Sequence, residues 1–291
     1  MIKSAIGLKA KVRNISQGDN KVAQAMIRIF FMERFLERVS LSKYKDKFVL
    51  KGGMLVSSLI GINLRSTMDI DTTVKALPLT KENLERIIME ICEIPLEDNI
   101  SFRIADMETI MDEFDYPGIR IHMEALLEKL KQPIKIDVST DDAITPGAIE
   151  YKYSLMFEKR EICLNTYNIE TLLAEKSQTI INRGLANTRM RDFYDLYEIV
   201  QKLEFSWNIY QQAFYSTCKK RGTIFSKEKV ETELKNLLES TEMEKMWNRF
   251  KDKNYFVENV EYSKIIKTIT DTIMSIYDKG NNASGNRLDS Q

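Results

Sequence analysis

The feature that most constrains the fold is a strand, a glycine pair, a helix and a second strand within residues 47–74. Lys47 to Leu50 forms a short apolar run typical of a buried strand, and it leads directly into Lys51-Gly52-Gly53. Met54 to Ile60 then has helical spacing, and Met68 to Val74 predicts a second strand. This order indicates a compact α/β unit, and it does not recur elsewhere in the chain.

The segments around this unit extend it in both directions. Apolar residues between Lys21 and Val39 recur at helical spacing while charges fill the other side, which predicts an amphipathic helix. A second helix is expected over Thr80 to Ile91, with Thr80 as its N-cap. Strands are expected at Ile100 to Ile104, Gly118 to Ala125 and Pro133 to Ser139, with a turn over Asp115 to Gly118.

After Thr166 the pattern becomes helical almost throughout. We therefore expect an α/β (α+β) domain with a mixed sheet, preceded by N-terminal helices and followed by an all-helical domain. The expected division is 1–160, 161–279 and a polar tail over 280–291. The predicted helices are Ile169 to Arg183, Thr188 to Leu203, Trp207 to Arg221, Lys227 to Leu238 and Asn259 to Asp278.

Composition excludes several classes of protein. Lys plus Arg and Asp plus Glu are both 43, and a net charge of zero argues against a uniformly basic nucleic-acid-binding surface. Three scattered cysteines do not form a disulfide framework, and the single histidine, His122, gives no zinc cluster. Neither a signal peptide nor a membrane span is expected, so the chain is predicted to be cytoplasmic.

The sharpest chemical signal is Asp69-Ile70-Asp71. Residues i and i+2 of a strand point to the same face, so the two carboxylates are expected to converge. Their repulsion can be relieved by a divalent cation, and hard oxygen ligands suit Mg²⁺ or Mn²⁺ better than zinc. The alternative for an isolated pair of this kind is an exposed strand or turn without a ligand.

Two further features strengthen the metal hypothesis. Gly52 and Gly53 open a helix, where backbone amides can approach a phosphate, although a glycine pair can also be just a tight turn. Asp137 lies on the polar face of an alternating strand, where it could equally face solvent. Three carboxylates on two strands beside a glycine turn would form a site for metal-assisted phosphoryl or nucleotidyl transfer.

These residues resemble the first motif of the AbiEii/AbiGii nucleotidyltransferase toxin family, within the polymerase-β-like nucleotidyltransferase superfamily. The family comprises toxins of type IV-style toxin–antitoxin and abortive-infection systems, which act in phage defence. The resemblance extends from Glu33 to Tyr197, with the motifs in family order. They are Phe48-Val49-Leu50-Lys51-Gly52-Gly53, Arg65-Ser66-Thr67-Met68-Asp69-Ile70-Asp71, Lys135-Ile136-Asp137-Val138, Glu170-Thr171-Leu172-Leu173-Ala174-Glu175-Lys176 and Asn187-Thr188-Arg189-Met190-Arg191-Asp192-Phe193-Tyr194-Asp195-Leu196.

The resemblance implies roles for residues that spacing alone leaves open. Lys176 would contact the nucleotide triphosphate, although a lysine on a helix face is ordinarily a solvated charge. Asp192 would be the acidic residue of the last motif, whereas Asp195 is interpreted as structural; simple ion pairs are the alternative for both. Thr67 stands where relatives often have Ser, and its hydroxyl could bond a phosphate or become modified.

The implied reaction is metal-dependent transfer of NMP from an NTP to an RNA, with the tRNA 3′ end as the expected acceptor. Asp69 and Asp71 would hold Mg²⁺, while Asp137 would complete the metal site or help deprotonate the attacking hydroxyl. The resemblance also implies an antitoxin encoded alongside, without a stable complex. Two alternatives remain open: a phosphotransferase acting on a protein or small molecule, and a catalytically inactive interaction module.

The zero net charge conceals an asymmetry. Residues 1–50 contain 11 Lys and Arg and four Asp and Glu, a net charge of +7, so the remainder carries −7. The basic residues of this segment form a candidate RNA-facing surface, with solvated helix faces as the alternative. They are Lys3, Lys9, Lys11, Arg13, Lys21, Arg28, Arg34, Arg38, Lys43, Lys45 and Lys47.

Overall fold

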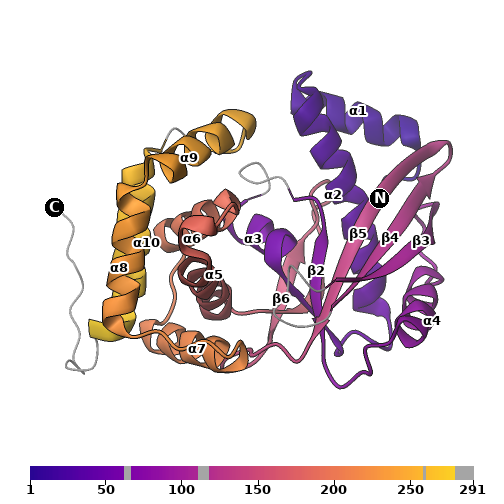
Figure 1. The fold of residues 1–291 in the computed structure, drawn as a ribbon. Coiled ribbons are helices and arrows are strands. Elements are labelled where there is room, and N and C mark those ends of the chain that lie inside the picture. Colours follow the sequence, from indigo (N-terminus) through magenta and orange to yellow (C-terminus); the bar gives the residue numbers. More distant parts are fainter. Residues whose placement is uncertain (62–66, 111–117, 258–259, 279–291) are drawn as a thin grey trace. The chain divides into compact units, whose positions relative to one another are not determined.

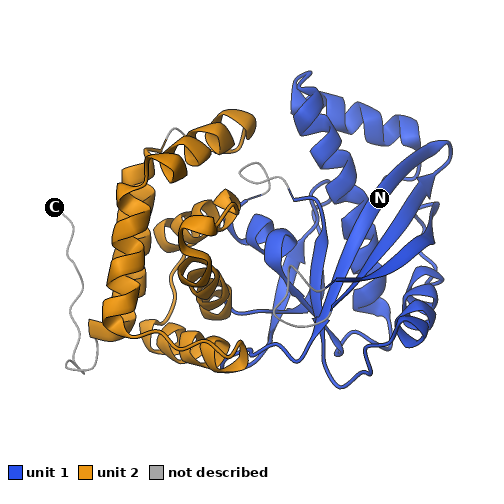
Figure 2. Cartoon of the chain, viewed as in Figure 1, with its two compact units in different colours: residues 1–168 blue, residues 169–291 orange. Residues whose placement is uncertain are grey.

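The computed structural model contains two compact units, residues 1–168 and residues 169–291 (Figures 1 and 2). It describes residues 1–61, 67–110, 118–257 and 260–278. The predicted turn at Asp115 to Gly118 falls largely outside these ranges, and the predicted tail lies entirely outside them.

Unit 1 is built on a seven-stranded mixed sheet with the strand order β3-β4-β5-β2-β1-β7-β6. β1 pairs in parallel with β7, and β2 in parallel with β5, whereas the other neighbours are antiparallel. This mixed sheet, with helices before it and a helical unit after it, confirms the predicted fold class. The elements are α1 (Ala5–Ser16), α2 (Asn20–Leu41), β1 (Phe48–Lys51), α3 (Gly52–Ile60), β2 (Ile70–Val74), α4 (Lys81–Cys92), β3 (Ile100–Ile110), β4 (Gly118–Leu127), β5 (Leu130–Thr140), β6 (Ile149–Ser154) and β7 (Glu161–Thr166).

Helices cover the sheet at three places. α3 packs on β1 and β2, α2 packs on β5 and β7, and α4 packs on β3 and α2. Thr80 caps α4 as predicted, because its side chain accepts a hydrogen bond from the Asn83 N–H. No bounds were predicted for α1, β6 and β7. β6 lies at the edge of the sheet, and its alternation of apolar and polar residues, Ile149-Glu150-Tyr151-Lys152-Tyr153-Ser154, is a strand signal that the prediction missed.

Unit 2 consists of helices. α5 packs against α6, α7 and α8, while α10 packs against α6, α7, α8 and α9. α9 was not predicted, although Met243, Met246, Trp247 and Phe250 recur at helical spacing among its otherwise polar residues. The elements are α5 (Ile169–Arg183), a 3₁₀ turn η2 (Gly184–Ala186), α6 (Met190–Lys202), α7 (Trp207–Lys220), α8 (Lys227–Glu239), α9 (Thr241–Lys253) and α10 (Tyr262–Asp278).

The charged side of α2 is not solvated, contrary to the amphipathic pattern. Glu33, Arg34, Glu37 and Arg38 are all buried, each at most 4% exposed. Burial of Arg34, Glu37 and Arg38 is tolerable because each pairs with an opposite charge, whereas burial raises the pKa of Glu33 to about 8, so that this carboxyl keeps its proton near neutral pH. The contacts join Glu33 to the Met156 N–H, Arg34 to Glu37 and Glu158, Glu37 to Arg160, and Arg38 to Asp98.

The Arg38–Asp98 pair provides a test of this arrangement. Two Arg38 nitrogens donate to the two Asp98 oxygens at 2.8 and 2.9 Å, and Asp98 is fully buried. Replacing Asp98 by Asn leaves a buried guanidinium without its counter-charge, so the free energy of unfolding should fall by about 3 kcal/mol. Denaturant titration measures this loss.

The neighbouring residue supplies the control for that experiment. Glu97 forms an ion pair with Lys3 in which both side chains are exposed, at 88% and 51%. Because solvent screens such a pair, Glu97→Gln should leave stability unchanged. Equal losses for the two variants would contradict the assigned importance of the buried pair.

Candidate active site

Four charged side chains form a row across four adjacent strands of unit 1. In register order they are Lys51 on β1, Asp71 on β2, Asp137 on β5 and Arg120 on β4. Residues that are directly opposite across neighbouring strands point to the same face of a sheet. The sheet therefore brings two carboxylates side by side and places one cation on each outer flank. We call Lys51, Asp71, Asp137 and Arg120 the charged row.

The glycine pair contacts the Asp71 side chain directly. The Gly53 N–H donates a hydrogen bond to Asp71 Oδ2 at 3.1 Å. Gly52 has a φ of +57°, and a Cβ at this position would lie 2.1 Å from the same oxygen. Glycine is therefore required at position 52 for two reasons, its left-handed backbone and the close approach of the carboxylate. The start of α3 contacts a carboxylate in this structure.

Asp71 carries an unfavourable charge. Burial and the neighbouring Asp137 carboxylate raise its pKa to about 6, and Asp69 adds to this effect, while the Gly53 hydrogen bond and Lys51 act in the opposite direction. Asp69 Oδ1 lies 2.9 Å from Lys135 Nζ, yet it is buried and accepts no hydrogen bond. An unsatisfied buried oxygen beside a destabilised carboxylate fits a divalent cation, which would satisfy both.

Asp137 is engaged differently from the other two carboxylates. It is 1% exposed, so the solvent-facing alternative is wrong, and its oxygens accept two hydrogen bonds from Arg120 at 2.8 Å each. Within the described ranges, no group of three or more His, Cys, Asp or Glu side chains is placed to hold a metal ion. Asp69 and Asp71 thus remain the fitting pair in this conformation. The contribution of Asp137 to a metal site stays a prediction.

Lys51 is held in a buried network that includes a residue the sequence did not single out. Lys51 is 4% exposed, and its Nζ donates to Asp142 Oδ2. Burial alone would raise the pKa of Asp142, but Lys51, together with the Tyr167 and Ser139 hydroxyls, holds it below its usual value. Asp142 is therefore a counter-charge that fixes Lys51. It lies five positions after Asp137 and two after the end of β5, and no spacing rule would have marked it.

Thr67 is also buried, at 2% exposure. Its hydroxyl donates to the backbone carbonyl of Asp69 at 3.3 Å, which ties the segment before β2 to the first carboxylate. The described contact of this hydroxyl is therefore within the chain. A contact with phosphate, or a modification of Thr67, stays a prediction.

In unit 2, Lys176 of α5 lies between two carboxylates of α6. Its Nζ donates to Asp192 Oδ1 and to Asp195 Oδ2, both at 2.8 Å. The Asp195 side chain is fully buried, whereas 20% of the Asp192 side chain is exposed. The structure thus joins the two helical motifs into a cluster of Lys176, Asp192 and Asp195. Asp195 provides the buried anchor, and Asp192 is the carboxylate that solvent can reach.

The proposed basic surface of residues 1–50 is smaller than the sequence suggested. Arg34 and Arg38 are 1% and 2% exposed and belong to the buried pairs of α2, so they cannot contact a macromolecule. Lys3, Lys43 and Lys45 are paired with acidic residues. Exposed cations remain on α1 and at the start of α2, and they are Lys9, Lys11, Arg13 and Lys21.

The comparison with protein families decides the identity of this arrangement. The family described as nucleotidyl transferase AbiEii toxin, Type IV TA system, matches residues 34–266. The chain belongs to the AbiEii nucleotidyltransferase toxin family. This match includes both the charged row and the Lys176 cluster, and it confirms the family that the motifs indicated.

Solved structures provide weaker likenesses. JHP933 from Helicobacter pylori is 15% identical with a TM-score of 0.49, covering 88% of this chain and 93% of that one. An antigenic nucleotidyltransferase-like protein from Paracoccidioides brasiliensis is 16% identical with a TM-score of 0.36, covering 81% and 95%. No curated protein matches the chain. None of the helices in the described ranges is long and apolar enough to cross a membrane.

Gly52→Ala tests the contact between α3 and Asp71. The new Cβ would displace the Asp71 carboxylate and strain the backbone, so nucleotidyl transfer should fall by at least about 100-fold. Gly147→Ala is the matched control, because nothing lies within 4 Å of a Cβ there. Transfer assays and thermal unfolding of both variants provide the measurement. Full activity of Gly52→Ala would show that the close approach is dispensable.

The raised pKa of Asp71 predicts a pH-dependent effect on stability in metal-free protein. Between about pH 4 and pH 6 the folded state keeps a proton on Asp71 that the unfolded state has lost, so wild-type stability falls as pH rises through this window. Asp71→Asn removes this cost. It should be more stable than wild type by about 1 to 3 kcal/mol at pH 7 and equally stable near pH 3.

The exposed Asp106 of β3 provides the control for this measurement. Asp106→Asn should show the same pH dependence as wild type, since this exposed substitution leaves Asp71 and its neighbours unchanged. Denaturant titrations with a chelator present, at several pH values, compare the three proteins. A constant difference between Asp71→Asn and wild type across this range would contradict the assigned pKa.

Proposed function

We propose that this chain is a metal-dependent nucleotidyltransferase toxin that transfers NMP from an NTP to an RNA, with the tRNA 3′ end as the expected acceptor. The observation that carries the proposal is Asp71, a carboxylate held against a glycine turn between two other carboxylates. Its charge is unfavourable in the protein alone and would become favourable beside a cation. Such a site is suited to a nucleotide that arrives with Mg²⁺ or Mn²⁺.

The roles of the unit 1 residues follow from their contacts. Asp69 and Asp71 would bind the cation, which supplies charge neutralisation at the phosphates when it is bound. The Gly53 N–H orients Asp71, and the Asp142 carboxylate orients Lys51. Lys51, Gly52, Gly53 and Thr67 are assigned to the nucleotide side of the site.

Asp137 has two open roles, and its pairing with Arg120 constrains both. The bidentate contact with Arg120 uses one lone pair on each Asp137 oxygen and offsets the charge of this carboxylate, so it competes with either role. Release of one oxygen by Arg120 would favour both roles. The released guanidinium would then be available to a phosphate, which it recognises well.

In unit 2, Lys176 is assigned to the triphosphate, with Asp192 as its accessible partner. Between two carboxylates the ammonium is held in one position, so a phosphate that replaced Asp192 would meet a cation already oriented. Asp195 would keep that cation in place.

The acceptor and the cellular role belong to the same proposal. The exposed cations Lys9, Lys11 and Arg13 lie on α1, which contains no acidic residue, and they are suited to an RNA backbone. Membership in the toxin family implies a cognate antitoxin. That the antitoxin forms no stable complex, and that the pair acts in abortive infection as phage defence, stay predictions.

Transfer of label to RNA tests the proposal. Purified protein is incubated with Mg²⁺, total RNA and each α-labelled NTP in turn, and labelled RNA is then separated and sequenced at its 3′ ends. Wild type should label RNA from at least one NTP. Asp69→Asn should reduce labelling by about 100-fold or more, because the cation loses a ligand, and a chelator should abolish it.

Asp106→Asn is the control and should label RNA as wild type does, since Asp106 is an exposed carboxylate on the same sheet. Transfer from γ-labelled but not α-labelled NTP would replace the proposal by a phosphotransferase. Equal labelling by wild type and Asp69→Asn, or none with any NTP and acceptor, would overturn it in favour of an inactive interaction module.

A further inference from the structure

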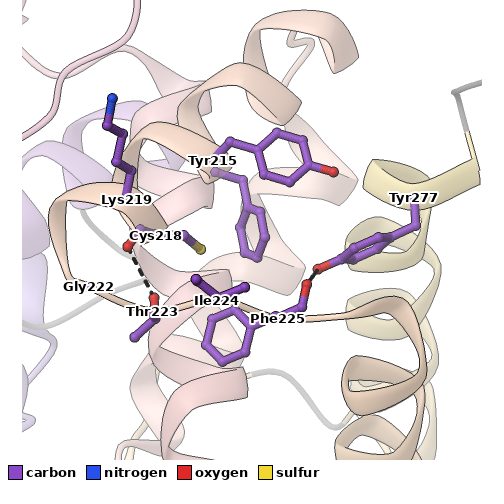
Figure 3. A pocket seen from close by; sticks show the side chains of 9 residues that line it. Tyr215, Cys218, Lys219, Gly222, Thr223, Ile224, Phe225 and Tyr277 are labelled. Carbon is purple, nitrogen blue, oxygen red and sulfur yellow. Dashed lines mark hydrogen bonds between the residues drawn. The ribbon is translucent and has the colours of Figure 1, made fainter.

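Unit 2 contains a pocket of about 380 Å³ lined largely by aromatic and apolar side chains (Figure 3). Tyr215 from α7 and Tyr277 from α10 approach it from different helices, and Phe225 from the α7–α8 connection completes it. Tyr215 is 48% exposed, and Ile224 is 92% exposed. Covering apolar surface of this kind with a ligand lowers the free energy. The pocket is therefore suited to binding an apolar or aromatic group.

The walls of this aromatic pocket are held in place by hydrogen bonds. The Tyr277 hydroxyl donates to the Phe225 carbonyl at 3.3 Å, which fixes α10 to the α7–α8 connection. The Thr223 N–H donates to the Cys218 carbonyl at 2.9 Å and closes the turn after α7. A flat ligand would thus meet rings that are already ordered, so little entropy is lost on binding.

A second pocket of about 280 Å³ adjoins the first, because Phe225 lines both. Its lining is more polar and includes Arg183 at the end of α5 and Lys229 in α8. Lys229 Nζ lies 5.5 Å from the centroid of the Phe225 ring. An apolar site for a ring and a cationic site for an anion are therefore joined through one residue.

The cations of these two pockets lack carboxylate partners. Within the described ranges, Arg183, Lys219 and Lys229 form no ion pair. The nearby Arg221 and Lys227, by contrast, pair with Glu175 at 3.4 Å and with Asp278 at 2.8 Å. Among the residues that line the two pockets, Glu233 alone is acidic. The pair of pockets therefore carries excess positive charge and is complementary to a polyanion.

We infer that the two pockets bind a single-stranded segment of RNA, with one unpaired base in the aromatic pocket and the adjoining phosphates beside Arg183 and Lys229. Stacking on Tyr and Phe rings is how proteins hold unpaired bases without a sequence requirement. The inference rests on the proposed function, whose acceptor RNA it would anchor. A free triphosphate suits the site less well, since the cations are spread over two pockets and form no compact anion cradle.

Binding of RNA in the absence of NTP tests this inference independently of catalysis. The probe is a short fluorescein-labelled single-stranded RNA, and anisotropy measures its Kd for the full chain carrying Asp69→Asn. Tyr215→Ala should raise the Kd by about tenfold or more, whereas Tyr215→Phe, which keeps the ring, should leave it unchanged. Lys229→Ala should weaken binding and reduce the slope of log Kd against log salt by about one.

Two matched variants lie outside the pockets. Tyr255→Ala removes another partly exposed tyrosine of unit 2, and Lys235→Ala removes another lysine of α8. Both should bind RNA as the parent does. Equal effects of the pocket variants and these controls would overturn the inference. So would tighter binding of a double-stranded probe, or a result in which Tyr215→Ala weakens the binding of a labelled NTP or an apolar peptide and leaves the binding of RNA unchanged.

The proposed function and this inference can fail separately. Tyr215-dependent RNA binding without any label transfer would support the pockets and contradict the enzyme. Transfer to RNA with an unchanged Kd and KM for Tyr215→Ala and Lys229→Ala would support the enzyme and contradict the pockets. Because Tyr215 and Lys229 lie on the surface of unit 2, thermal unfolding should show that their variants remain folded.

Discussion

The repulsion between Asp71 and Asp137 is the constraint on which the rest of unit 1 depends. Parallel pairing of β2 with β5 sets these two carboxylates side by side on one face of the sheet. The protein compensates one of them fully, since Arg120 occupies both oxygens of Asp137, and leaves the other with a pKa of about 6. Of the two carboxylates, Asp71 is therefore the one whose charge an external cation would stabilise more. Glycine is required at position 52 because α3 begins in contact with the Asp71 carboxylate, to which the Gly53 N–H donates a hydrogen bond.

Sequence reasoning found the parts of this site that are local and missed those that depend on strand register. The spacing of Asp69 and Asp71, the glycine pair and the alternation around Asp137 each lie within a few residues, so periodicity was sufficient to find them. Arg120 and Asp142 become part of the site through pairing with β5 and through the turn after it. Such contacts are set by the sheet, and a single sequence does not specify which strands are neighbours.

The same distinction explains α2. Its helical periodicity and its approximate ends were predictable, but the pattern placed Glu33, Arg34 and Arg38 in solvent, and they are buried. A charge is buried when a partner elsewhere compensates it, and the partners here lie about 60 to 120 residues away in sequence. By contrast, periodicity alone was sufficient to predict helices such as α5, whose predicted bounds are those of the structure.

Compensation of charge also determines where a nucleic acid could be bound. Counterion release requires cations that solvent reaches and that no carboxylate already neutralises. In unit 1 five of the eleven basic residues before β1 fail one of these conditions, and the fully exposed cations that remain lie on α1 and at the start of α2. In unit 2 Arg221 and Lys227 are neutralised, while Arg183, Lys219 and Lys229 are not. A net charge of zero is thus compatible with RNA binding, because it is a sum over the whole chain and does not exclude small areas in which exposed cations outnumber carboxylates.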